Sequence, residues 1–320
     1  MNYTLQNLRD RLPKEALLSF DQSFSGEELR ILYEGMRRPR ISSFRANLLE
    51  TSHTEVVNGL RRDGIKFCEF APIEYSYQLT SKEKELKKTD LYCDGALYLQ
   101  GLSGMLAPLW LAPTDKDRVL DVAAAPGSKT TMLAGLMGNR GHIDALEPDA
   151  IRLSRLKHNC DILGVKNTSF HQVEAQRFRP EETFYSKILA DVPCSGEGRF
   201  NLYDGPSYLR YRANDIPKFA RLQKKILKHA ANLLEVSGRM VYSTCTLNQQ
   251  ENEEVVADLL ASGAETGREY RCLPPPVSEH HFNILREFLR IETKSGVQAL
   301  RILPSERFEG FFLSLIERVS

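Results

Sequence analysis

Apolar positions along most of the chain recur with the periods of short strands and amphipathic helices in alternation. Residues 119–122 form a short apolar, partly β-branched run, which is typical of a buried parallel strand. Apolar residues at helical spacing follow over 129–137, and a second strand is predicted over 142–146. This order predicts an α/β fold with a Rossmann-like, doubly wound parallel sheet and helices on both faces.

The same alternation continues toward the end of the chain. Helices are predicted over 150–163, 214–235 and 249–260, and strands over 168–173, 186–190 and 240–244. Asn248 and Glu251 have the spacing of a capping box for the last of these helices. Segments 300–304 and 310–319 predict a final antiparallel strand pair, and 262–297 has the weakest pattern.

The first 90 residues predict a small α/β module. Two or three amphipathic helices are expected over 5–37, strands over 43–48, 65–67 and 75–79, and a helix opened by a capping box of Ser52 and Glu55. The charged stretch 81–90 is predicted as a linker, which divides the chain into domains of 1–90 and 91–320. Arginines near the first strand, Arg45 among them, would contact RNA phosphates if exposed, although solvated helix ends explain these charges equally well.

Composition indicates an ordinary soluble enzyme of about two domains. The 320 residues include 43 basic and 42 acidic side chains, so any affinity for nucleic acid must come from local patches. The first residues lack a long apolar run, which predicts neither a signal peptide nor a membrane anchor. The six cysteines form no C-x-x-C pair, so reduced thiols in a cytoplasmic protein without a bound metal are expected. Nothing in the sequence sets an oligomeric state.

Candidate chemistry begins in the turn between the first predicted strand and its helix. Its almost side-chain-free backbone can pass close to a ligand; the residues are Ala123, Ala124, Ala125, Pro126, Gly127, Ser128 and Lys129. The spacing fits neither a P-loop nor a three-glycine dinucleotide fingerprint. A nucleoside without phosphates remains, S-adenosyl-L-methionine being the usual one, with Glu147 placed to hold its ribose hydroxyls. An ordinary turn without a ligand stays open.

Two cysteines follow predicted strands directly. Cys194 stands in the segment 191–194, and Cys245 follows the strand 240–244. Since ligands gather beyond the carboxyl ends of parallel strands, we expect both thiols near the nucleoside turn and Glu147. A single strand cysteine is usually a small buried hydrophobe, and this explanation suits Cys68, Cys160 and Cys272.

Three motifs together resemble a known family. The segments AAAPGSKTT, DVPCSGEGRF and YSTCTLNQQENEEVV are similar to those of the Sun/NOL-type S-adenosylmethionine-dependent RNA cytosine-5 methyltransferases. The resemblance is strong over about 90–320 and weaker over 40–80, through FRANLLETS. It implies a class I methyltransferase sheet, S-adenosyl-L-methionine at 123–129, Glu147 on its ribose and Glu174 near its adenine.

The same resemblance implies the catalytic roles. Cys245 is the nucleophile, Cys194 assists product release, and Asp191 contacts the target base and the amino end of the cofactor. A thiolate that adds to carbon 6 of cytosine breaks the aromaticity of the ring and makes carbon 5 nucleophilic enough to accept a methyl group. Lys129 is a candidate for the positive charge that favours the thiolate.

A basic segment follows the first thiol. Residues 199–228 contain eight basic and two acidic side chains, with Phe200, Tyr203, Tyr208 and Tyr211 among them. We expect these aromatic rings to offer stacking surfaces and Arg199, Arg210 and Arg212 to contact phosphates. The target base should be unpaired or flipped. A solvated helix face explains Lys224, Lys225 and Lys228 better. The predicted function is carbon-5 methylation of cytosine in structured rRNA or tRNA. A DNA cytosine-5 methyltransferase and a non-catalytic RNA-binding assembly factor remain alternatives.

Overall fold

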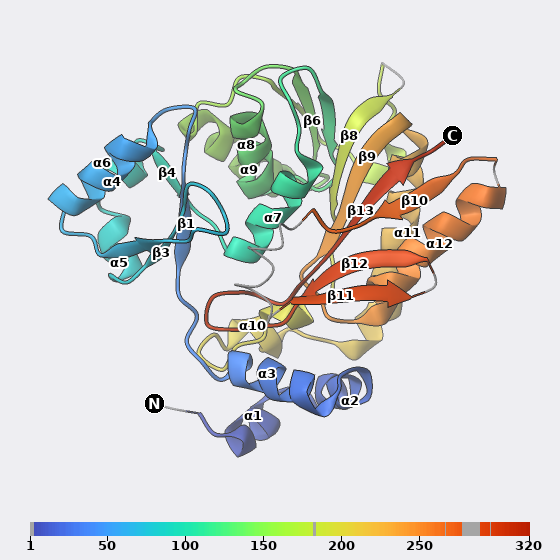
Figure 1. Cartoon of the computed structure of the whole chain (residues 1–320), viewed down its shortest axis with the longest axis horizontal. Coiled ribbons are helices and arrows are strands. Elements are labelled where there is room, and N and C mark those ends of the chain that lie inside the picture. Colours follow the sequence, from blue (N-terminus) through green and yellow to red (C-terminus); the bar gives the residue numbers. More distant parts are fainter. Residues whose placement is uncertain (1–2, 182–183, 266, 277–288, 295) are drawn as a thin grey trace. The chain divides into compact units, whose positions relative to one another are not determined.

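Figure 1 shows the computed structural model with its helices and strands labelled. The chain forms two compact units. Unit 1 comprises Met1–Arg40, Val192–Lys228 and Tyr242–Ser320, and unit 2 comprises Ile41–Asp191 and His229–Val241. The structure describes residues 3–181, 184–265, 267–276, 289–294 and 296–320. Helix α11 (Ile216–Asn232) and strand β9 (Leu234–Thr244) each contribute residues to both units.

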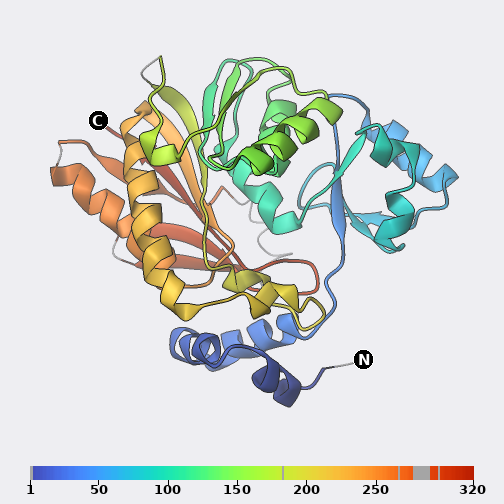
Figure 2. The same ribbon diagram turned by 180° about the vertical axis from the view of Figure 1, so that it is seen from behind.

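Unit 2 contains the predicted parallel sheet. Strands β5 (Arg118–Asp121), β6 (His142–Leu146), β7 (Thr168–His171) and β8 (Tyr185–Asp191) pair in parallel in the order β8-β5-β6-β7. Helices α7 (Leu102–Leu111), α8 (Ser128–Leu136) and α9 (Ala150–Ile162) belong to the same unit (Figure 2). Asp149 caps α9 by accepting a hydrogen bond from the backbone of Arg152. The predicted strand–helix–strand order is confirmed here.

A small antiparallel sheet also belongs to unit 2. Its strands β1 (Ser43–Ala46), β2 (Phe67–Glu69), β3 (Ser76–Leu79) and β4 (Leu97–Leu99) lie in the order β2-β3-β1-β4. Helix α4 (His53–Arg62) begins at the predicted capping box of Ser52 and Glu55. The stretch predicted as a linker contains α5 (Glu83–Leu86) and the start of α6 (Asp90–Cys93). Leu86 packs in the core of this sheet with Phe44, so the stretch is structured.

Unit 1 begins with three helices, α1 (Leu5–Arg11), α2 (Lys14–Ser23) and α3 (Gly26–Met36). Their apolar faces share one core with residues that lie far along the chain, including Phe200 and Leu303. The segment after the first thiol forms η2 (Glu197–Arg199), α10 (Pro206–Leu209) and η3 (Ala213–Asp215). The N-terminal helices therefore pack against the segment that was predicted to approach RNA.

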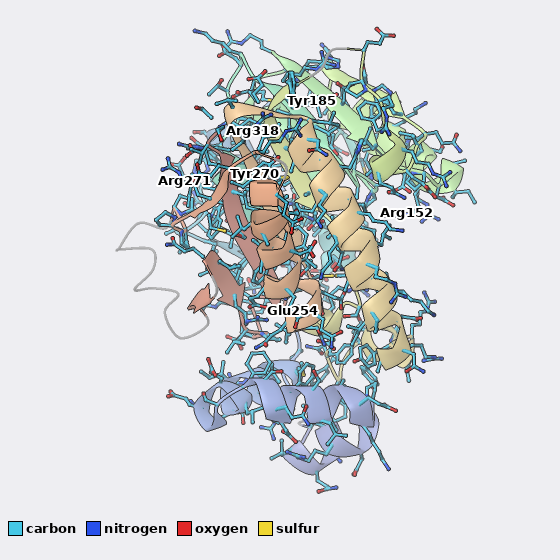
Figure 3. The ribbon with its side chains drawn as sticks, turned by 90° about the vertical axis from the view of Figure 1, so that its right-hand side faces the viewer. Arg152, Tyr185, Glu254, Tyr270, Arg271 and Arg318 are labelled. Atoms are coloured by element: carbon cyan, nitrogen blue, oxygen red, sulfur yellow. The ribbon has the colours of Figure 1, made fainter. Side chains whose placement is uncertain are left out.

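Antiparallel strands complete unit 1. Strands β11 (Leu289–Lys294), β12 (Val297–Ile302) and β13 (Phe311–Arg318) pair in that order, which confirms the predicted final antiparallel pair. Strand β10 (Tyr270–Leu273) also pairs with β13, and the partners Tyr270 and Arg318 are labelled in Figure 3. Turn η4 (Gln249–Glu251) precedes α12 (Glu253–Glu265). Of the poorly patterned stretch, residues 277–288 lie outside the described residues.

Candidate active site

The small-residue turn of unit 2 depends on Gly127. This glycine has φ +110°, and a Cβ there would lie 3.0 Å from Cδ1 of Leu156 on α9, so a side chain would be strained and crowded. Ser128, where helix α8 begins, follows it in helical conformation. The backbone N–H of Ala124 donates to the carbonyl of Leu146, 2.9 Å away, which anchors the turn to the end of β6. The backbone is thereby held in a side-chain-poor turn between β5 and α8.

Glu147 lies directly after β6 and is 1% exposed. One carboxylate oxygen accepts a hydrogen bond from the backbone N–H of Asp149 at 3.0 Å. The other, Oε2, lies 3.2 Å from Nη1 of Arg152, but among the described residues no donor reaches it with hydrogen-bond geometry. Arg152 also donates to the carbonyl of Ala125, which ties this carboxylate to the turn. A buried acceptor beside a small-residue turn suits a hydroxyl donor such as a ribose.

Three further acids of unit 2 differ in their surroundings. Asp191, the last residue of β8, lies 2.6 Å from Nζ of Lys129, so these two predicted site residues form an ion pair. Asp121, which the sequence reasoning missed, is buried at the end of β5, and burial raises its pKa to about 6. Glu174 pairs with Arg177 at 2.9 Å, and its proposed position near adenine stays a prediction. The effect of Lys129 on the nucleophile also stays a prediction.

The two predicted catalytic thiols lie together in unit 1. Sγ of Cys194 is 3.3 Å from Sγ of Cys245, and both residues are partly exposed. The loops that carry them are joined at two further points. Oγ of Ser195 lies 2.7 Å from Oγ1 of Thr246, and the backbone N–H of Gly198 donates to the carbonyl of Cys245 at 3.0 Å. This arrangement places two nucleophilic sulfur atoms within reach of one small electrophile.

Glu251 holds the loop of the first thiol. Its buried carboxylate accepts hydrogen bonds from the backbone N–H of Ser195 at 3.0 Å and from Nε2 of Gln223 at 2.8 Å. The predicted capping box was therefore wrong, because α12 begins only after η4 and the carboxylate faces the thiol loop instead. Asn248 does accept a backbone hydrogen bond, but from Gln250 in the η4 turn.

Glu197 supports the loop of the second thiol from within the same core. It is fully buried, and its carboxylate accepts from the hydroxyl of Tyr211 at 3.0 Å and from Oγ1 of Thr246 at 3.4 Å. Burial raises the pKa of Glu197 to about 7, and the nearby carboxylate of Glu251 adds to this effect. The sequence reasoning missed Glu197 and assigned Glu251 to a helix cap, although each stands within a few residues of a thiol.

Replacing Glu197 with Gln should change how the stability of the protein depends on pH. Between the ordinary pKa near 4.5 and the folded pKa near 7, the folded chain holds a proton that the unfolded chain has released. The free energy of unfolding therefore falls as pH rises through this window, and a neutral Gln removes this contribution. Urea unfolding at pH 5 and pH 7.5 measures this effect. The free energy of unfolding of the variant relative to the wild type should rise by up to about 3 kcal/mol between the two pH values.

The internal control for this experiment is the difference in free energy of unfolding between variant and wild type at pH 4. At pH 4 the carboxyl of Glu197 is protonated in the folded chain and mostly protonated in the unfolded chain, so the offset between variant and wild type should lie close to its acidic limit. An offset that stays constant from pH 4 to pH 7.5 would show that the carboxyl does not titrate between these values.

Comparison with known proteins places this geometry in a family. The family model described as 16S rRNA methyltransferase RsmB/F matches residues 108–317, a range that includes the turn and both thiols. The chain belongs to the RsmB/F family. It is 37% identical over 232 residues to ribosomal RNA small subunit methyltransferase F of Aeromonas salmonicida, covering 70% of this chain and 48% of the relative. The relative of the same name from Salmonella heidelberg is 34% identical, with coverages of 78% and 51%. The chain spans about half the length of these curated relatives.

Solved structures agree with the predicted fold class. A methyltransferase homolog protein from Pyrococcus horikoshii is 28% identical with a TM-score of 0.74, covering 96% of this chain and 99% of that one. NSun6 from Pyrococcus horikoshii, solved with SFG, is 21% identical with a TM-score of 0.82, covering 98% and 100%. The second similarity shows the fold alone. The predicted α/β methyltransferase fold and the predicted family are therefore both confirmed.

One predicted RNA contact of this RsmB/F chain is corrected by the structure. Arg45 is 5% exposed, with Nε donating to Oε1 of Gln100 at 2.9 Å and Nη2 donating to Oγ1 of Thr131 at 2.8 Å. Burial lowers its pKa to about 10. The expectation of an exposed guanidinium was wrong because the side chain is enclosed between Gln100 and helix α8, where Thr131 accepts its hydrogen bond. Arg45 instead connects that sheet to α8.

The basic segment of unit 1 is partly as expected. Arg199, Arg210 and Arg212 are exposed, and their contact with phosphate stays a prediction. The stacking surfaces were wrongly predicted for three of the four aromatic side chains, because these pack in the core shared with α1–α3: Phe200, Tyr208 and Tyr211. Tyr203 is 40% exposed and remains available for a base. Of the cysteines expected to be buried, Cys160 is buried and Cys68 is exposed.

The described residues contain neither a membrane-spanning helix nor a cluster of metal ligands. Across the described ranges, none of the helices has both the length and the apolar character that crossing a bilayer requires. In those ranges, no cluster of three or more His, Cys, Asp or Glu side chains is arranged to hold a metal ion.

Proposed function

We propose that this protein transfers a methyl group from S-adenosyl-L-methionine to carbon 5 of a cytosine in small-subunit rRNA. The observation that carries the proposal is the pair of thiols, Cys194 and Cys245, 3.3 Å apart in a chain of the RsmB/F family. One thiol suffices for packing or for a simple nucleophile, whereas two adjacent thiols suit a reaction that must both form and release a covalent adduct.

The cofactor would bind along the turn of unit 2. The backbone of 123–129 would run beside the methionine and adenosine parts, and Oε2 of Glu147 would accept a ribose hydroxyl. S-adenosyl-L-methionine supplies an electrophilic methyl group on its sulfonium. Glu174 would lie toward the adenine, and the Lys129–Asp191 ion pair toward the amino acid end and the target base.

Chain continuity supports a joint action of the carboxylate and the thiol. Cys194 follows Asp191 by three residues, which span at most about 11 Å between Cα atoms even when fully extended. The proposed reaction requires two groups on one cytosine. A carboxyl contacts ring nitrogen 3, and a thiol acts near carbon 5. The sequence therefore carries the two groups at a spacing that a single nucleotide can bridge.

The proposed reaction uses the thiols in turn. Cys245, as thiolate, adds to carbon 6 of the cytosine, and the resulting enamine attacks the methyl group through carbon 5. Asp191 contacts the cytosine ring at nitrogen 3 and stabilises the adduct. A base then removes the carbon 5 proton, the electron pair restores the ring double bond, and Cys245 leaves as thiolate. Cys194 assists this release.

Methyl transfer to defined nucleic acids tests the proposal. Small-subunit rRNA from cells that lack the protein should accept radiolabelled methyl groups, and bisulfite sequencing should locate them at cytosine. DNA of matching sequence should remain unlabelled, and tRNA from the same cells is the second comparison. Labelling of DNA or of tRNA alone would refute the rRNA substrate. Cofactor binding without transfer to any cellular RNA would instead indicate an assembly factor.

The wider assignments follow from this substrate. Residues 1–90 would supply RNA contacts beyond the catalytic region 91–320, and Arg199, Arg210 and Arg212 would contact phosphates of an unpaired strand. Such a protein would work in the cytoplasm, where its thiols stay reduced.

A further inference from the structure

A pocket of about 380 Å³ lies in unit 1, between the start of α2 and the segment that follows α10. This volume falls in the range of small-molecule sites, roughly 300–1,000 Å³. Its lining residues come from two parts of the chain that are separated by nearly 200 positions. They are Arg11, Pro13, Glu15, Tyr208, Leu209, Tyr211, Arg212, Ala213 and Asn214.

Two arginines, Arg11 and Arg212, line the pocket. Nη1 of Arg212 donates to the carbonyls of Leu209 at 3.2 Å and Tyr211 at 2.7 Å, which holds this exposed side chain against the wall. Arg11 is exposed at the end of α1. Glu15 adds one carboxylate, so a phosphate is favoured near the arginines and disfavoured beside Glu15. A group with N–H or O–H donors is favoured at Glu15.

An aromatic pair adjoins the pocket through Arg11. The guanidinium of Arg11 lies 4.7 Å from the ring centroid of Tyr3, and its Nη1 donates to the Tyr3 hydroxyl at 3.1 Å. The rings of Tyr3 and Tyr203 meet edge to face with centroids 4.9 Å apart. Tyr203 is 40% exposed, so one part of its ring is accessible beside Tyr3. Exposed rings beside cations form a surface on which unpaired bases stack.

We propose that this pocket and the Tyr3–Tyr203 pair form a subsite for an unpaired RNA nucleotide that flanks the target cytosine. The inference rests on the proposed function for the identity of the RNA. A base would stack on Tyr203, a neighbouring phosphate would contact Arg11 or Arg212, and a base amino group or ribose hydroxyl would donate to Glu15. The site thus takes one nucleotide of a continuous strand.

Binding of a fluorescein-labelled single-stranded RNA of mixed sequence tests the subsite without any need for methylation. Tyr203→Ala should raise Kd about tenfold, because one base loses its stacking partner. Arg11→Ala and Arg212→Ala should each weaken binding several-fold and reduce the slope of log K against log salt by about 0.7. Tyr203→Phe, which keeps the ring, should bind like the wild type.

Arg30→Ala is the matched control, since Arg30 is exposed on α3 and does not line the pocket. Its Kd and salt slope should equal those of the wild type. Wild-type Kd and slope in the Tyr203→Ala and Arg212→Ala variants would overturn the subsite. If these variants lose RNA affinity while the wild type methylates no RNA, the subsite stands and the proposed function falls. Tight competition by free cytidine monophosphate with no effect of strand length would instead show a mononucleotide site and overturn the proposal.

Discussion

Replacing Cys245 with Ala is expected to reduce methyl transfer to rRNA by about 10⁴-fold or more, as the loss of a covalent nucleophile does in other enzymes. The physical reason is that carbon 5 of cytosine is a poor nucleophile until a thiolate has added at carbon 6. Radiolabel incorporation measures the rate, and a denaturing gel detects the protein–RNA adduct. The variant should show neither, while its affinity for S-adenosyl-L-methionine, measured by calorimetry, should match that of the wild type.

Cys93→Ala provides the thiol control for this experiment. Cys93 is an exposed free cysteine in unit 2, so its loss should leave both the methylation rate and the adduct unchanged. Thiol loss alone is thereby separated from loss of the nucleophile. Methylation by Cys245→Ala at more than about one hundredth of the wild-type rate would exclude Cys245 as the essential nucleophile.

The parts of the site that the sequence could predict are those fixed by local spacing. The helix caps at Ser52 and Asp149 and the strand ends before Glu147 and Cys245 depend on neighbouring residues, and the structure has them where the pattern placed them. A turn that needs a positive φ is also local, and Gly127 marks it. For these features, backbone geometry and hydrophobic period carry most of the information.

The parts that the sequence could not predict depend on residues far along the chain. Arg45 looks like a surface charge until its partners Gln100 and Thr131, more than 50 residues later, are known. Glu251 fits a capping box, and its partner is Ser195 on the other thiol loop. Tyr208 and Tyr211 look like stacking surfaces until the N-terminal helices bury them. Tertiary packing overrides a local pattern in each case.

Replacing Cys194 with Ala is expected to trap the enzyme on its RNA. Cys245 remains able to add to the base, and methyl transfer can follow, but release loses the thiol that lies 3.3 Å from the nucleophile. Turnover should fall about 10²- to 10⁴-fold, the usual range for loss of one group that assists proton transfer. A denaturing gel should show an RNA adduct that survives heating in detergent, at a level close to one per enzyme molecule.

The double variant without either thiol assigns the adduct to one sulfur. If Cys245 forms the bond, the Cys194→Ala adduct disappears when Cys245 is also replaced, and the trapped base already carries its new methyl group. If Cys194→Ala forms no adduct while Cys245→Ala does, the two roles are reversed, as in DNA cytosine-5 enzymes with a Pro-Cys nucleophile. The hydrogen bonds around the thiols do not distinguish the two roles. Glu251 holds the loop of Cys194 and Glu197 holds the loop of Cys245, with similar contacts. The methylation state of the trapped cytosine therefore decides the order of events, since addition must precede methyl transfer and release must follow it.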